Sequence, residues 1–486
     1  MYALRLRLRE PLSRELVIAV ACALGTLLLA YAGAHKLGAG GLLLPLGVVL
    51  LVILMRYPLA MVIVTTGAVI LGEGSTFGLF SFTSHLYNHV YRELTAVDFL
   101  VALTLVSVCL DIMRKRRSVS MPRPMAFALS LLVLAMVPGA ITGHAAGMGV
   151  RSVLLGENVL VYLLLIPVAV ANLDLSLDRV RMLLLGAVGL AVVKAVLGLV
   201  EIVGHKGTSI EGTSTLTYYE PTANWLIMIV LLGVVVAVVA RMHPPRGLLL
   251  GSPLLLASLL LSYRRSFWIA VVLGLLLVVM FGVSQSGRRL LIPVGLLLVV
   301  AIWLLGSVHW QNSQSAVVRR AASLNPSSLE QNVEDRYRLD ERVNVLGAIG
   351  EHPVTGLGVL VPWSAKFQPL SIEHPEARQY VHFAFLWFWL RLGILGAVAY
   401  LSLLFAAALI SWRVWRYRRE PLFRAFGLAS LCGLIGLVVI ETTATFTGVD
   451  PRFNVVLGLQ LGLLSLLAPE ARSSSTEPAS AVPTLT

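Results

Sequence analysis

Apolar runs of 17 or more residues recur along the whole chain, and they constrain the fold more than any other feature. In a bilayer only α-helices and closed barrels satisfy all backbone hydrogen-bonding groups, and about 20 apolar residues in a helix cross the ~30 Å hydrocarbon core. The runs are continuous and do not alternate with polar residues, which predicts helices and excludes a β-barrel. The composition agrees, because 57% of the residues are hydrophobic and only 13% are charged. We therefore expect an all-α polytopic membrane protein.

The runs predict about 12–14 transmembrane helices, grouped around one long polar segment. About eleven helices fall in residues 1–307 and about three in residues 382–468, while residues 308–381 form a large loop between these late helices. Residues 469–486 are rich in Ser, Pro and Thr, and predict a disordered tail. The predicted spans begin near residues 17, 40, 57, 97, 124, 153, 182, 222, 246, 267, 290, 382, 422 and 453.

The basic residues predict the orientation of the chain. Cytoplasmic loops carry an excess of Lys and Arg, and placing the N-terminus inside puts the basic clusters on the cytoplasmic side. Both termini are then cytoplasmic, and the loop 308–381 is extracytoplasmic. The net charge of +13 follows largely from this topology, and no nucleic-acid partner is needed to explain it. The clusters are RLRLRE, RKRRSVSMPRP, RMHPPR, SGRR and RVWRYRREPLFR.

The extracytoplasmic loop contains basic residues that the topology does not explain. Large loops translocate regardless of charge, so their presence alone does not require a function. The loop also contains a segment with helical periodicity, EDRYRLDERVNVLGAIGE, which predicts an amphipathic helix lying against the membrane-embedded body. The apolar face of this helix is expected to carry Leu339, Val343, Leu346 and Gly350. The basic residues of the loop are Arg319, Arg320, Arg336, Arg338, Arg342, Lys366 and Arg378.

Two arginine pairs are candidate ligands for an anion. Arg338 and Arg342 lie one helical turn apart and form a fork suited to a dianion such as pyrophosphate. The alternative is an ion pair with a neighbouring carboxylate at position 334, 335 or 341. Arg264 and Arg265 lie at the outer ends of two spans, where an arginine close to hydrocarbon usually faces a cavity or an anion. Snorkelling of one of the two is the alternative.

Other charges lie inside the predicted spans. Lys194 and Glu201 are two turns apart on one helix and are expected to pair with groups on neighbouring spans. Arg391 is expected to extend toward the cytoplasm and to have a structural role.

A histidine begins the first late span, in QYVHFAFLWFWLRLGILGAVAYL, residues 379–401. Leu386 lies four positions after His382, Gly393 lies eleven positions after His382, and Gly396 follows. Phe383 comes directly after His382, at a position where the family pattern described in the next paragraph has Asn. Taken alone, an imidazole at this place is either a proton-transfer group or an interfacial side chain in an aromatic belt.

This pattern resembles the signature of the O-antigen ligase and O-antigen polymerase superfamily of bacterial membrane glycosyltransferases. Two further motifs are similar to that superfamily. Arg338 precedes Pro353 of HPVTGLG by fifteen positions, and SYRRSF places Arg265 at the family's Arg position, with Arg264 before it. The segment YYEPTANW, which contains Glu220 and Asn224, resembles the lead-in to this region. The resemblance covers residues 210–410.

The resemblance implies a GT-C-like, inverting and metal-independent glycosyltransferase. It would move a glycan from undecaprenyl pyrophosphate to a hydroxyl of a lipid-anchored or glycan acceptor, at the outer face of the bacterial inner membrane, in lipopolysaccharide or other cell-envelope polysaccharide synthesis. No cofactor and no metal are expected. His382 would be the catalytic base. Pyrophosphate would be bound by Arg265, Arg338, Arg342 and Arg264, with Arg336, Glu220 and Asn224 as supporting candidates.

Such a reaction needs a base for the acceptor proton and cations for the departing pyrophosphate, and the chain offers both residue types on one side of the membrane. Three alternatives stay open. A polymerase of the same superfamily uses the same donor chemistry. A transporter or flippase for a lipid-linked glycan would also need cationic residues, but no internal repeat is present and the loop is long for a gate. A purely structural scaffold explains the loop arginines poorly.

Overall fold

The computed structural model describes residues 53–72, 89–91, 94–156, 158–204, 208–209, 216–217, 220–242, 246–282, 333–372 and 378–468. The predicted spans that begin near residues 17, 40 and 290 begin outside this part of the chain, and the tail 469–486 lies outside it entirely.

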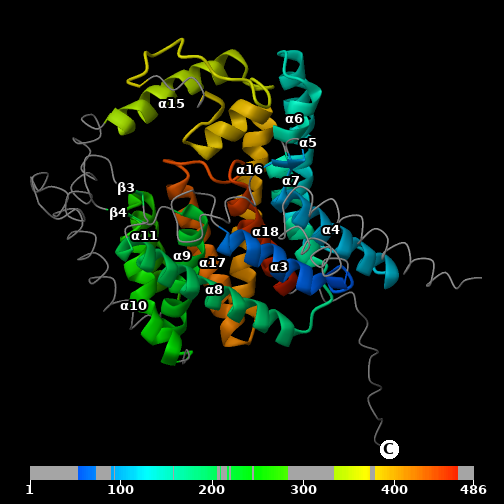
Figure 1. The fold of residues 1–486 in the computed structure, drawn as a ribbon, viewed down its shortest axis with the longest axis vertical. Coiled ribbons are helices and arrows are strands. Elements are labelled where there is room, and N and C mark those ends of the chain that lie inside the picture. The colour runs from blue at the N-terminus through cyan, green and yellow to red at the C-terminus, as the bar shows by residue number, and fades with distance from the viewer. Residues whose placement is uncertain are drawn as a thin grey trace, which may run out of the picture.

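Long apolar helices dominate the described residues (Figure 1). Within the described part of the chain, eight helical segments are long and apolar enough to cross a membrane, with α6 and α7 counted as one. Helices α3, α10 and α18 are shorter but also apolar. These helices begin within a few residues of the predicted starts, which confirms the all-α polytopic membrane architecture. Their bounds are α3 Pro58–Leu71, α4 Ala96–Arg114, α5 Arg123–Ala145, α6 Val150–Gly156, α7 Asn158–Ala171, α8 Leu177–Val203, α9 Pro221–Val239, α10 Arg246–Leu260, α11 Arg265–Gly282, α15 Val333–Glu351, α16 Ala384–Tyr417, α17 Pro421–Ile440 and α18 Pro451–Leu467.

Two short hairpins lie between helices. β1 (His89–Tyr91) pairs antiparallel with β2 (Leu94–Thr95), and β3 (Thr208–Ser209) pairs antiparallel with β4 (Leu216–Thr217). The sequence sets several helix starts. Thr95 and Asp98 form a reciprocal capping box at α4, and the Asp450 carboxylate caps α18. Proline in the first turn begins α9, α17 and α18, where its missing N–H costs nothing.

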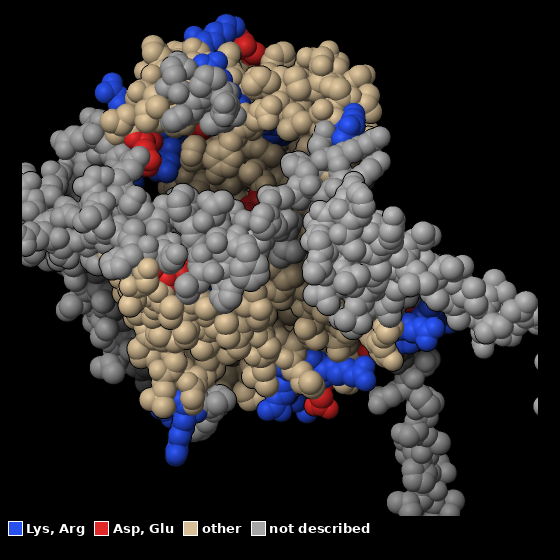
Figure 2. All heavy atoms as spheres, in the orientation of Figure 1, with Lys and Arg blue, Asp and Glu red and all other residues tan. Residues whose placement is uncertain are grey.

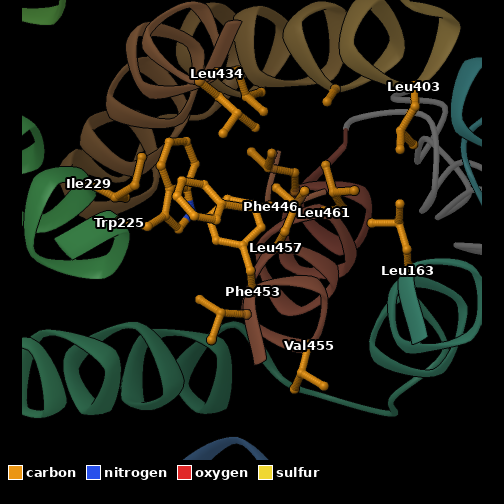
Figure 3. Close-up of a cluster of buried hydrophobic side chains, with 14 of the residues drawn as sticks. Leu163, Trp225, Ile229, Leu403, Leu434, Phe446, Phe453, Val455, Leu457 and Leu461 are labelled. Carbon is orange, nitrogen blue, oxygen red and sulfur yellow. The ribbon is translucent and has the colours of Figure 1, made fainter. Parts of the chain in front are cut away.

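The core lies where α9, α16, α17 and α18 meet (Figure 3). Trp225 of α9 packs at 5.7 Å, centroid to centroid, on Phe453 of α18, which packs at 5.6 Å on Phe446. α9 and α17 are the most buried of the spans. These inner helices provide a fixed frame for the loops at their ends.

Helix α15 crosses the end of the bundle at which α16 begins (Figure 1). The turn after α15 enters a break in α16 at Gly393, whose φ of +70° and ψ of −168° only glycine readily adopts. There the Leu357 N–H donates to the Leu390 carbonyl at 2.7 Å, and the Ile394 N–H donates to the Val354 carbonyl at 3.2 Å. A Cβ on Gly393 would lie 2.0 Å from the Val354 oxygen. The turn therefore fixes α15 relative to α16.

The predicted helix in the loop is confirmed, but the predicted orientation of its faces is wrong. Leu339, Val343 and Leu346 are 43%, 48% and 53% exposed. The face toward the body is more polar and includes Asp335, Asp340, Glu341 and Asn344, together with Tyr337, Val345, Ala348 and Ile349. Carboxylates can be buried here only because they have hydrogen-bonding or charged partners. The periodicity of the apolar residues does not reveal those partners.

Candidate active site

The candidate site lies between α15 and the end of the bundle at which α11 and α16 begin and α17 ends. In the orientation of Figure 1, the surface is hollowed between the α15 layer and the helices below it, with charged side chains at the rim of the hollow (Figure 2). Most of the predicted site residues lie on α15 or at the starts of α11 and α16.

His382 is held by a buried carboxylate on α15. Its Nδ1 lies 3.0 Å from Oε2 and 3.2 Å from Oε1 of Glu341, and its backbone N–H donates to Oε2 at 2.8 Å. The Glu341 side chain is 1% exposed, whereas the His382 side chain is 24% exposed. Carboxylate oxygens accept hydrogen bonds, so the contact favours the tautomer with the proton on Nδ1 and leaves Nε2 as the acceptor nitrogen of the ring.

Two tyrosines confine the imidazole. The ring of Tyr380 meets that of His382 edge to face at 4.7 Å, and the ring of Tyr337 does so at 6.0 Å. The Tyr380 hydroxyl donates to the Thr445 carbonyl at 3.0 Å and accepts from the Thr445 N–H at 2.8 Å. Burial raises the pKa of Tyr380 well above its ordinary value. This hydroxyl stays protonated and positions the ring.

Asp335 joins two of the predicted pyrophosphate ligands. Nη2 of Arg265 lies 2.7 Å from both Asp335 oxygens, and Nη1 of Arg338 lies 2.9 Å from Oδ1. The three side chains are 13%, 25% and 8% exposed for Arg265, Arg338 and Asp335. Pairing with Asp335, which the sequence left as an alternative, is therefore present. One carboxylate opposes two guanidinium groups, so the cluster keeps a net positive charge.

Arg342 and Arg264, the other two predicted pyrophosphate ligands, each lie over an aromatic ring. Arg342 donates to the Thr442 carbonyl, and its guanidinium lies 5.3 Å from the ring centroid of Phe383. Burial lowers the pKa of Arg342, while the Glu341 charge opposes that effect. The Arg264 guanidinium lies 5.4 Å from the Phe446 centroid. Both cations therefore rest on aromatic faces.

A second buried carboxylate anchors the loop after α17. Glu441 accepts hydrogen bonds from the Tyr400 hydroxyl, from the Thr447 N–H at 2.7 Å and from the Phe446 N–H at 3.3 Å. Its backbone carbonyl accepts from the Ala384 N–H at 3.0 Å. Burial raises the pKa of Glu441. The loop that carries Thr442 is thus tied to the first residue of α16.

The supporting candidates are not joined to this cluster. Arg336 is on the exposed face of α15. Glu220 pairs with Lys194 at 3.1 Å and with Arg452 at 2.6 Å, which confirms that Lys194 pairs across helices. Asn224 is fully buried on α9, and neither side-chain atom has a hydrogen-bond partner within the described chain.

The structural role expected for Arg391 is confirmed, but the expected snorkelling is wrong. Its side chain is 2% exposed, and it donates to the backbone carbonyls of Val361 and Gln379 in the segment between α15 and α16. Arg391 therefore ties this segment to α16 and does not extend out of the bundle. The loop carbonyls supply the acceptors that a buried guanidinium requires.

Sequence reasoning missed the roles of Glu341 and Asp335, which it treated only as alternative partners for the arginines. A signal existed, since Asp335, Arg338 and Glu341 follow one another at three-residue spacing on one side of a helix. The contact between Glu341 and His382 joins residues 41 positions apart, so no local pattern indicates it.

Residues 250–401 match the family model described as O-antigen ligase. This region includes α10, α11, α15 and the first half of α16, and it therefore contains His382, Arg265, Arg338 and Arg342. No curated protein matches the chain significantly. Among the described residues no group of three or more His, Cys, Asp or Glu side chains is arranged to hold a metal ion.

Proposed function

We propose that this multi-pass membrane protein is a glycosyltransferase of the O-antigen ligase and polymerase superfamily, and that it moves a glycan from undecaprenyl pyrophosphate to an acceptor hydroxyl at the outer face of the inner membrane. The single observation that carries the proposal is the Glu341–His382 contact beside the cluster of Arg265, Arg338 and Asp335. It combines a polarised base with fixed cations, which are the two groups that glycosyl transfer from a pyrophosphate needs.

In the proposed reaction, Nε2 of His382 takes the proton of the acceptor hydroxyl. The acceptor oxygen forms a bond to the anomeric carbon while the bond from that carbon to the pyrophosphate oxygen breaks, with inversion. The imidazolium is stabilised by the Glu341 carboxylate 3.0 Å away. General-base assistance of this kind is typically worth about 10²–10⁴ in rate.

The guanidinium groups bind the lipid pyrophosphate as its negative charge increases. Arg265 and Arg338 share Asp335, which orients both side chains before the donor arrives. Preorganised donors stabilise developing charge without reorganisation in the transition state. Arg342 and Arg264 lie close enough to the same region to add charge, and no metal is assigned a role.

We propose the ligase type of reaction, with a lipid-anchored acceptor, and the polymerase is its sibling. The test is glycan transfer by purified, lipid-reconstituted protein, with EDTA present, from a glycan-loaded undecaprenyl pyrophosphate. Transfer of complete chains to a lipid-anchored core supports the ligase. Head-to-tail joining of lipid-linked repeat units would instead identify a polymerase, and movement of donor across the bilayer without transfer would identify a transporter.

A further inference from the structure

A cavity of about 940 Å³ lies within the bundle, away from the candidate active site. It is lined mainly by α3, α8, α9, α17 and α18, with Leu248 at the start of α10, and almost all of the lining is apolar. On α9 the lining extends from Trp225 to Ala237, which is about 18 Å along the helix axis. This length is slightly more than half of the ~30 Å hydrocarbon core, and so corresponds to one leaflet.

Three glycines open the walls of this cavity. Within the described part of the chain, a Cβ added at Gly67 of α3 or at Gly186 of α8 would meet no atom within 4 Å. A Cβ at Gly233 of α9 would meet nothing nearer than Ala429, at 3.8 Å. Helix interfaces in membranes use glycine for close backbone approach, but these glycines do not approach another backbone. They widen a space between helices.

Among the described lining residues, the charged ones lie at one end of the cavity. Arg179 and Arg181, in the first two turns of α8, and Glu420, which precedes α17, line this end. Nε of Arg181 is 3.9 Å from the Glu420 carboxylate, and the two side chains are 59% and 33% exposed. An exposed pair at this distance is weak, and the described lining contains two guanidinium groups and one carboxylate. The end therefore favours an anionic group.

We propose that this cavity binds an anionic phospholipid, with its acyl chains between the helices and its phosphate on Arg179 and Arg181. Basic pockets between transmembrane helices on the cytoplasmic side are typical sites for anionic head groups. The polyprenyl donor fits less well, because its pyrophosphate is assigned to the opposite end of the bundle, near α15. The proposal does not depend on the proposed glycosyl transfer.

The test measures binding of dioleoyl phosphatidylglycerol and dioleoyl phosphatidylcholine to the full-length protein in neutral detergent, by native mass spectrometry and by thermal melting. Phosphatidylglycerol is expected to bind more tightly and to raise the melting temperature. The double variant Arg179→Gln/Arg181→Gln should weaken its binding by on the order of tenfold or more, because both cations that contact the phosphate are removed.

A cavity-filling variant separates this site from nonspecific lipid binding. Gly186→Leu should abolish the specific binding and keep the fold, since its Cβ has open space. The matched control is Gly251→Leu on α10. A Cβ at Gly251 also meets nothing within 4 Å in the described part of the chain, but Gly251 is not among the residues that line the cavity. Equal binding of both lipids, or unchanged binding in Gly186→Leu, would overturn the proposal. Displacement of phosphatidylglycerol by undecaprenyl phosphate would also overturn the proposal if undecaprenyl phosphate bound the arginine variant and the parent protein with equal affinity. The cavity would then be a site for the polyprenyl chain of the donor.

Discussion

Glu341 of α15 lies 3.0 Å from Nδ1 of His382, and it also accepts the backbone N–H of the same histidine. A single buried carboxylate thus fixes both the position and the tautomer of the imidazole. The contact connects α15 to the start of α16, and in the proposed reaction it determines which ring nitrogen meets the acceptor hydroxyl.

Replacing Glu341 with Gln is expected to lower turnover by about tenfold or more and to leave donor binding nearly unchanged, because the charge that stabilises the imidazolium is lost. Asp at this position should restore part of the rate, since it keeps the charge. Glycan transfer and donor binding are measured separately in reconstituted protein. Glu351→Gln is the control, because it removes only an exposed pair with Lys366. Normal turnover in a folded Glu341→Gln protein would remove Glu341 from the mechanism.

Asp335 should couple the two arginines that it contacts. Asp335→Asn and Arg338→Ala are each expected to weaken donor binding, and the double variant should lose less than the sum of the two. Residues in one ion-pair network show coupling energies of about 0.5–3 kcal/mol. A double-mutant cycle on donor affinity measures the coupling. Strict additivity would mean that Asp335 does not organise the anion site.

Gly393→Ala is expected to destabilise the protein and to reduce transfer. Alanine cannot adopt this backbone conformation without strain of about 1–3 kcal/mol, and its Cβ would lie 2.0 Å from the Val354 oxygen. The melting temperature should fall by several degrees, while Gly189→Ala on α8, where a Cβ meets nothing within 4 Å, should melt like the parent protein. If Gly393→Ala matched that control, the inserted turn would not be what holds α15 in place.

The raised pKa of Glu441 predicts that the stability of the protein depends on pH. Burial raises the pKa of its carboxyl above the ordinary value of 4.5, so between these two values the folded protein binds more protons than the unfolded chain. The contribution of this residue to stability therefore falls as pH rises through that window. Glu441→Gln cannot titrate, and its melting temperature relative to the parent should increase from about pH 4 to about pH 8. A difference that does not change with pH would contradict this account.

The sequence predicted the helices well because the bilayer imposes length and composition on each span separately. The described helices α4, α5, α9 and α17 begin within one or two residues of their predicted starts. The sequence also singled out the basic residues of the loop and His382 as candidates, because they depart from the apolar pattern.

The orientation of α15 could not be predicted from hydrophobicity. Its buried face carries Glu341 and Asp335, whose burial depends on partners at positions 382 and 265. The direction of the Arg391 side chain was predicted wrongly for the same reason, because the carbonyls that accept its hydrogen bonds come from a loop folded back onto α16. Ion pairs and loop contacts between distant residues have no periodic signature.

The central claim is that His382 is the base and that the arginines hold the donor. The most direct measurement follows transfer and donor binding in parallel for His382→Ala and Arg338→Ala, with Lys366→Ala as an exposed-cation control and folding checked by melting. His382→Ala should bind donor normally and transfer about 10²-fold more slowly or worse, whereas Arg338→Ala should lose both binding and turnover. A well-folded His382→Ala protein that transfers at the normal rate would contradict the account.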